Sequence, residues 1–79
     1  MTIKVLLETD CSGCKATLEA IRTVAEEKGG IDVEPITDVK TILGYKVWRM
    51  PAIVIDERVV SVGKNLNHEQ VQKLIEQNL

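Results

Sequence analysis

Both cysteines of the chain lie in one Cys-x-x-Cys motif, Cys11-Ser12-Gly13-Cys14. The motif stands between a short apolar run over residues 3–7 and a segment of helical periodicity. Two sulfurs three residues apart lie within one helical turn, and Cα atoms at that spacing are close enough for a disulfide. This position between a strand and a helix constrains the fold, and it makes reversible disulfide chemistry the leading hypothesis.

The length and composition predict a single domain over residues 1–79. A chain of 79 residues is near the lower size at which one hydrophobic core holds a fold. Hydrophobic residues make up 44% and charged residues 28%, which is ordinary for a globular protein. No apolar run is long enough for a bilayer, and acidic residues follow the amino end too early for a secretory signal. We therefore expect a soluble, cytoplasmic protein with no membrane partner.

The charge pattern argues against nucleic acid as a partner. The net charge is −2, and acidic and basic residues are interspersed, so no basic stripe is available for a phosphate backbone. Trp48 and Tyr45 are the only aromatic residues, which is too few for a surface on which bases stack.

The first half of the chain predicts a strand, a helix and a second strand. The run Ile3–Leu7 is typical of a strand buried on both faces in the middle of a sheet. From Cys14 onward a helix is expected, ended by Gly29-Gly30. Residues 31–36 alternate apolar and polar side chains around Pro35, which favours an edge strand. The apolar face of the expected helix consists of Ala16, Leu18, Ile21, Val24 and Ala25.

The second half predicts a brief helix, a hairpin and a final helix. Asp38 can cap a short helix that Gly44 ends. Apolar runs over 52–55 and 59–62 flank the three residues 56–58, the pattern of a three-residue hairpin turn. Asn67 and Gln70 form a capping box for the last helix, with Leu66 stapled against its first turns. The expected buried stripe of that helix is Val71, Leu74, Ile75 and Leu79.

The order of elements predicts an α/β fold with the pattern βαβ-α-ββα. The first helix is long enough for a right-handed crossover between parallel strands, and the hairpin adds antiparallel strands. We therefore expect a four-stranded mixed sheet with helices packed on it.

This order, with the cysteine motif opening the first helix and a proline opening the third strand, resembles the thioredoxin fold in its minimal, glutaredoxin-sized form. The chain is similar to the small redox-active disulfide proteins of prokaryotes, and the likeness covers nearly all of it. The residues that carry the resemblance are Cys11-Ser12-Gly13-Cys14-Lys15, Met50-Pro51-Ala52, the hairpin Val54–Val62 and Gly63.

The resemblance implies a substrate-binding role for four residues. In the family, the proline that matches Pro51 is cis and lies beside the disulfide, while the backbone of the preceding residue pairs with an extended substrate. Met50 therefore is expected to offer its N–H and C=O to a partner, and Ser12 and Gly13 to contact the partner between the cysteines. The resemblance implies activity as an electron-transport protein that reduces protein disulfides.

Three departures from the family pattern concern the same site. Asp10 stands where thioredoxins have a tryptophan, and Ser12-Gly13 replaces a pair that contains proline. The first strand holds no buried acid. For the glutathione grip of glutaredoxins the chain offers only Gly63-Lys64-Asn65, so glutathione is not an expected partner.

The residues themselves predict unequal roles for the two thiols. A cysteine at a helix N-terminus is stabilised as thiolate by free N–H groups and by the helix dipole, which assigns Cys11 as nucleophile. Cys14, one turn further and more buried, resolves the mixed disulfide. Lys15 favours the Cys11 thiolate and Asp10 opposes it. We expect a monomer without cofactor or metal, acting on a protein disulfide and reset by an unidentified reductase.

Three alternatives remain at this point. A purely structural crosslink is unattractive because a loop of about four residues gives only roughly 2 kcal/mol in the loop-entropy model. Two thiolates at this spacing also bind Cu(I) or Zn, so a soft-metal binding or transfer module is the main alternative. A third alternative is a docking module that keeps the fold and has lost catalysis.

His68 is the only histidine, and the sequence places no second metal ligand near it.

Overall fold

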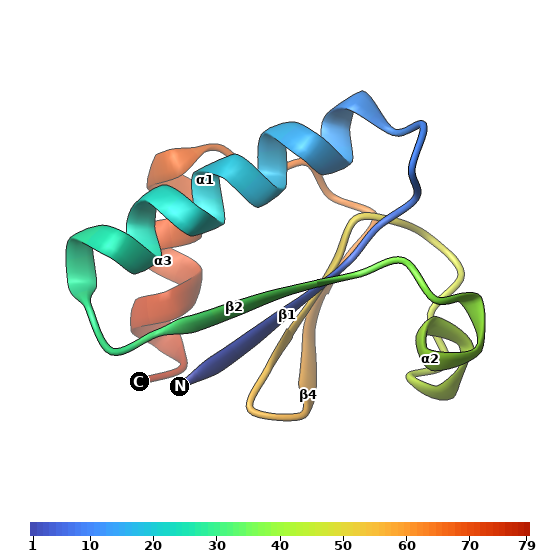
Figure 1. Ribbon diagram of the computed structural model, residues 1–79. Helices are drawn as coiled ribbons and strands as arrows, with labels where there is room; N and C mark the ends of the chain where they lie inside the picture. Colours follow the sequence, from blue (N-terminus) through green and yellow to red (C-terminus); the bar gives the residue numbers. More distant parts are fainter.

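The computed structural model describes residues 1–79, and its elements follow the predicted order (Figure 1). None of its helices combines the length and the apolar character needed to cross a bilayer. The elements are β1 (Thr2–Leu6), α1 (Ser12–Lys28), β2 (Asp32–Ile36), α2 (Val39–Gly44), β3 (Ala52–Ile55), β4 (Arg58–Val62) and α3 (His68–Gln77).

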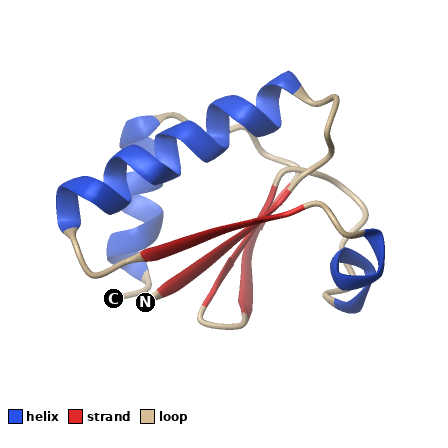
Figure 2. Ribbon diagram, in the orientation of Figure 1, coloured by secondary structure: helices blue, strands red, loops and turns tan.

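The four strands form one mixed sheet in the order β2-β1-β3-β4 (Figure 2). Strand β1 pairs with β2 in parallel and with β3 in antiparallel, and β3 pairs with β4 in antiparallel. The predicted α/β fold with a mixed four-stranded sheet is thus confirmed. The central place of β1 and the edge place of β2, which contains Pro35, also agree with the prediction.

Helices cover both faces of the sheet, and each face has its own core. Because neighbouring side chains of a strand point to opposite faces, Val5 and Leu6 of β1 belong to different cores. Figure 1 shows α1 and α3 together on one side of the sheet and α2 apart from them at its far end. The core under α1 and α3 consists of Ile3, Val5, Ile21, Val24, Ile53, Ile55, Val71 and Ile75. The core under α2 consists of Leu6, Ile42, Val47, Ala52 and Val54.

The hairpin turn differs from the expected three-residue turn. Only Asp56 and Glu57 lie in the turn, with φ angles of 47° and 70°, and Arg58 already begins β4. Two successive residues with positive φ match the right-handed twist of the strands. An irregularity of the pairing between Ile53 and Val54 takes up the shift in register. The polar residues 56–58 predicted a turn that is one residue too long, because Arg58 is polar but pairs with Ile55 in the sheet.

Two of the expected buried positions are also wrong. Ala16 of α1 is exposed, whereas Thr17 is fully buried, at 0% exposure. The hydroxyl of Thr17 accepts a hydrogen bond from the Leu66 N–H at 3.2 Å, which satisfies its polar atom inside the protein. Leu79 lies beyond the end of α3 and is 81% exposed, so it takes no part in the stripe formed by Val71 and Ile75.

A polar cluster ties α2 and the hairpin to the central strand. The Lys4 ammonium donates to the Tyr45 hydroxyl at 3.0 Å and to Glu57 Oε1 at 2.5 Å. The hydrogen bond with Glu57 is the main cause that raises the pKa of Lys4, and the bond from Lys4 is the main cause that lowers the pKa of Glu57. The cluster fixes the carboxyl end of α2, where Tyr45 is the C-cap residue.

Candidate active site

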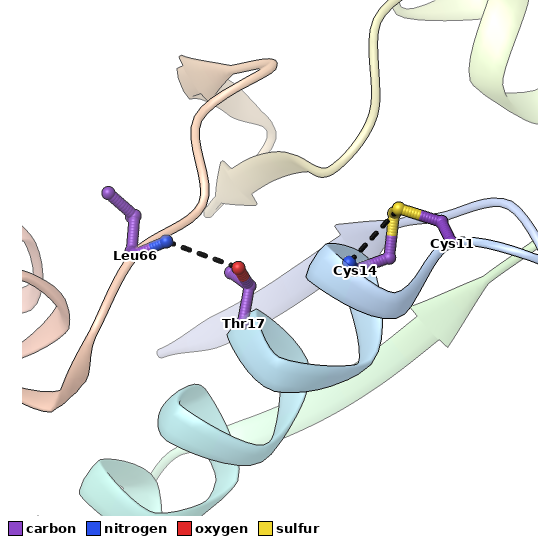
Figure 3. The surroundings of a disulfide bond; sticks show 4 residues. All are labelled: Cys11, Cys14, Thr17 and Leu66. Carbon is purple, nitrogen blue, oxygen red and sulfur yellow. Dashed lines mark hydrogen bonds between the residues drawn. A yellow bond between two sulfur atoms is a disulfide. The ribbon is translucent and has the colours of Figure 1, made fainter.

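Cys11 and Cys14 are joined by a disulfide at the first turn of α1 (Figure 3). Their Cα atoms are 5.1 Å apart, within the usual range for this bond. Cys11 is the N-cap residue of α1, and its Sγ accepts a hydrogen bond from the Cys14 N–H at 3.0 Å. The sulfur of Cys11 therefore occupies the place that a capping oxygen holds in most helices.

The two sulfurs differ in access. Cys11 is half-buried, whereas Cys14, in the first turn of α1, is only 1% exposed. A partner from solution can therefore reach Cys11, while Cys14 is reached only through Cys11. This agrees with the burial that the sequence predicts for the pair.

Helix α1 favours an anion at Cys11, whereas Asp10, the residue directly before it, opposes one. The sulfur lies at the positive end of a helix of 17 residues, and the first turn of that helix contains no acidic side chain. Lys15, exposed on the same turn, adds a positive charge. These features support the thiolate form that thiol–disulfide exchange requires.

The segment before β3 presents a free backbone. The peptide bond between Met50 and Pro51 is cis, as the family resemblance implies, and Pro51 is fully buried. The carbonyl of Pro51 accepts a hydrogen bond from the Gly63 N–H at 2.9 Å. By contrast, neither the N–H nor the C=O of Met50 is bonded to another backbone group. An extended segment can therefore pair with Met50 without displacing a bond of the protein.

An apolar groove of about 500 Å³ reaches Asp10, the residue before the cysteine motif. Val39 and Leu43 of α2 and Trp48 line it, and all three are exposed, Trp48 at 78%. Asp10 and Met50 border the same groove, so it adjoins both the residue before Cys11 and the free backbone of Met50. An exposed apolar group of this kind makes the groove a candidate surface for a partner. The groove is lined by Leu7, Glu8, Thr9, Asp10, Thr37, Val39, Ile42, Leu43, Val47, Trp48 and Met50.

The loop between β4 and α3 connects the two halves of the site. It begins at Gly63, whose φ of 69° is a conformation that favours glycine, and which bonds to Pro51. It ends on α1, where the Leu66 N–H meets Thr17 (Figure 3). Between these points Asn65 lies against Gly13 of the motif: a Cβ built on Gly13 would be 2.8 Å from Cγ of Asn65.

The structure brings some of the predicted site residues together. Cys11 and Cys14 are bonded, and Met50 lines the same groove as Asp10. Ser12 is exposed, and the side chain of Asn65 lies against Gly13. His68 pairs with Glu27 at 2.7 Å, at the opposite end of α1. No cluster of three or more potential metal ligands of the His, Cys, Asp and Glu types occurs.

Sequence reasoning missed the exposed apolar face of α2 and the place of Asn65. Val39 and Leu43 are four residues apart and so share a helix face, a signal present in the sequence. It was obscured because Ile42, which lies between them in the sequence, is buried. Asn65 carries no such signal, since its contact with Gly13 arises only when the chain folds.

Comparisons with known proteins agree with this geometry. A family model described as a thioredoxin domain matches residues 1–76. Thioredoxin 1 from the thermophilic eubacterium Thermosipho africanus is 27% identical, with a TM-score of 0.79 over 99% of this chain and 93% of that one. A search of curated proteins found no match.

Two further solved structures share the fold. A malarial protein gives a TM-score of 0.79 at 12% identity, over 99% of this chain and 96% of that one. A mutant of a thioredoxin-like protein gives a TM-score of 0.55 at 23% identity, over 94% of each chain. Because the thioredoxin family model covers almost every residue, from the strand before the cysteine motif to the last helix, this chain belongs to the thioredoxin domain family.

Proposed function

We propose that the protein is a thiol–disulfide oxidoreductase that carries electrons to protein disulfides through a reversible Cys11–Cys14 pair. The observation that carries the proposal is the asymmetry of the pair. Cys11 is accessible at a helix N-terminus, and Cys14 is buried with its Cα 5.1 Å away. A structural crosslink needs no such difference in access, whereas an attacking and a resolving thiol do.

The reaction proceeds in two exchanges. In the reduced protein the Cys11 thiolate attacks one sulfur of the substrate disulfide; a Cys11–substrate bond forms, the substrate bond breaks, and the released sulfur takes up a proton. Cys14 then gives up its proton and attacks Cys11 Sγ. The Cys11–Cys14 bond forms, the mixed disulfide breaks, and the second substrate sulfur leaves as a thiol. Two electrons have passed from the protein to the substrate; one of the two protons comes from Cys14, and the first released sulfur takes the other from solvent.

The groove and the Met50 backbone form the proposed docking surface for the substrate. An extended segment that pairs with the N–H and C=O of Met50 lies with one end over Trp48 and the exposed face of α2. Ser12, exposed between the cysteines, contacts the partner at the point of exchange. Binding energy then comes from apolar burial and main-chain bonds, and the cysteines supply the chemistry.

The proposal includes a monomer, a cytoplasmic location and an unidentified reductase. A protein that reduces disulfides must be reset after each turnover, and the cytosol holds the thiol-reducing systems that do this. The two cysteines carry the electrons themselves, so the proposal needs no cofactor.

A redox titration tests the proposal. The protein is equilibrated in dithiol buffers of graded potential, its thiols are alkylated, and the two forms are counted by mass spectrometry. We expect one reversible two-electron transition in which the ratio of reduced to oxidised protein changes tenfold per about 30 mV. Absence of a reversible couple contradicts the proposal. Tight Cu(I) binding without reduction of insulin disulfides would favour the metal-binding alternative.

Trp48→Ala tests the docking surface separately. Removing the largest apolar side chain of the groove is expected to raise KM for insulin reduction about tenfold, which corresponds to about 1.4 kcal/mol. The turnover number should change little because Trp48 does not touch the exchanging sulfurs. Leu79→Ala is the matched control, since Leu79 is equally exposed but lies outside the groove. An unchanged KM in the Trp48 variant would remove the groove from the docking surface.

A further inference from the structure

Asn65 presents an unpaired carboxamide beside the cysteine motif. Its side chain is exposed and lies against Gly13, between the two cysteines in sequence, and it makes no hydrogen bond within the chain. A carboxamide offers both a donor and an acceptor, the two groups that match the C=O and N–H of a peptide unit. The groove borders the motif at Asp10, whereas Asn65 borders it at Gly13.

The position of Asn65 is held from both sides. Two residues before it, Gly63 bonds to the carbonyl of Pro51, and in the next residue the Leu66 N–H bonds to buried Thr17. Asn67 then starts α3 with a complete capping box. The carboxamide is therefore carried by a fixed loop, which reduces the entropy lost when it binds a partner.

Gly13 makes room for this side chain. A Cβ at position 13 would lie 2.7 Å from Nδ2 and 2.8 Å from Cγ of Asn65, so any larger residue must push the carboxamide away. Asn65 is exposed and short of bonds, so it can turn out into solvent at little cost. Gly13 and Asn65 thus behave as a matched pair: a side chain at position 13 removes the carboxamide from the motif without removing it from the protein.

We propose that Asn65 is a specificity residue that hydrogen-bonds the peptide backbone of a substrate while that substrate is joined to Cys11. This inference rests on the proposed oxidoreductase function and adds the side-chain contact by which the protein prefers disulfides on a polypeptide backbone to small ones. Asn65 takes no part in the exchange of sulfurs. Small disulfides without peptide bonds react without its help.

The test compares two disulfides with four variants. The second-order rate constant for oxidation of the reduced protein is measured with a synthetic peptide that holds an internal disulfide, and with a small aromatic disulfide. Asn65→Ala is expected to slow the peptide reaction about fivefold, within the range of one hydrogen bond, and to leave the small disulfide within about twofold. Because Gly13 lies within the cysteine motif, its variant is compared as a ratio: Gly13→Ala should lower the peptide rate constant relative to the small-disulfide rate constant about fivefold, and the double variant should lower this ratio no further. Gln77→Ala, which removes an exposed carboxamide at the end of α3, is the control.

Separate readouts distinguish this role from a structural one. Helix propensity alone predicts that Gly13→Ala stabilises α1, so thermal unfolding should move upward while the peptide reaction slows. If Gly13→Ala does not fold, methylation of the peptide's backbone nitrogens beside its cysteines should slow wild type and spare Asn65→Ala. Equal loss on both disulfides in Asn65→Ala, no loss on either in that variant, or multiplying losses of the ratio in the double variant would overturn the inference. A wild-type protein that reduces neither disulfide would instead reject the proposed function.

Discussion

Cys14→Ser is expected to hold substrates on Cys11 as stable mixed disulfides. Without the buried thiol the first exchange still occurs, because Cys11 keeps its place at the N-terminus of α1, but nothing in the chain can release the partner. The complex should persist for minutes to hours, the time scale of uncatalysed disulfide rearrangement. Non-reducing electrophoresis of cell extracts, followed by mass spectrometry of the captured protein, measures the effect and identifies the substrate.

Cys11→Ser is the matched control for this trap. It removes the accessible sulfur and leaves one that is 1% exposed, so it should capture no partner and show no reductase activity. Capture by the Cys11→Ser variant, with none by Cys14→Ser, would mean that the two thiols have the opposite roles. If neither variant captures a partner and both variants still reduce insulin, the cysteine pair is not the electron carrier.

Ile53→Ala is expected to destabilise the protein by about 2–5 kcal/mol. Ile53 is 1% exposed in β3, which pairs with β1 and β4, and its side chain belongs to the core under α1 and α3. A domain of 79 residues has a total stability of about 4–12 kcal/mol. The substitution therefore removes a large part of the free energy of unfolding. Urea unfolding of the reduced and of the oxidised protein measures this loss.

Two substitutions calibrate this result. Ile53→Val keeps most of the side chain and should cost about 0.5–1.5 kcal/mol. Val59→Ala, on the exposed edge strand β4, should cost less than Ile53→Ala because less surface returns to water. A loss under about 1 kcal/mol for Ile53→Ala would be inconsistent with the close packing of this core.

The order of elements was readable because local signals agree with the tertiary fold. The glycine pair after α1, the capping box of Asn67 and the apolar runs of β1 and β3 each specify their element through nearby residues. The family resemblance added the cis bond before Pro51, which no local pattern in the chain specifies. Two local features predicted the properties of the cysteine pair. The Cys-x-x-Cys motif predicted that the two sulfurs can bond, and the helix that follows predicted that Cys11 is accessible and Cys14 buried.

The remaining features depend on contacts between distant residues. Thr17 can be buried without an unpaired hydroxyl because Leu66, 49 residues away, supplies a donor for it. Leu79 looked like part of the α3 stripe, but the helix stops at Gln77. Asn65 meets Gly13 only through the path of the loop from Gly63 to α3. Hydrophobic periodicity is assigned one segment at a time. It therefore predicts which face of a helix is buried, but it does not predict contacts between residues that are far apart in the sequence.

The exposure of Trp48 gives the protein a built-in optical reporter. It is the only tryptophan of the chain, it is 78% exposed, and it stands in the groove rather than in a core. Indole emission depends on the polarity around the ring, so a partner that fills the groove must displace water from the one fluorophore that dominates the signal. The rate of docking can thus be measured by tryptophan fluorescence, and the rate of disulfide exchange by counting thiols, in the same unlabelled protein.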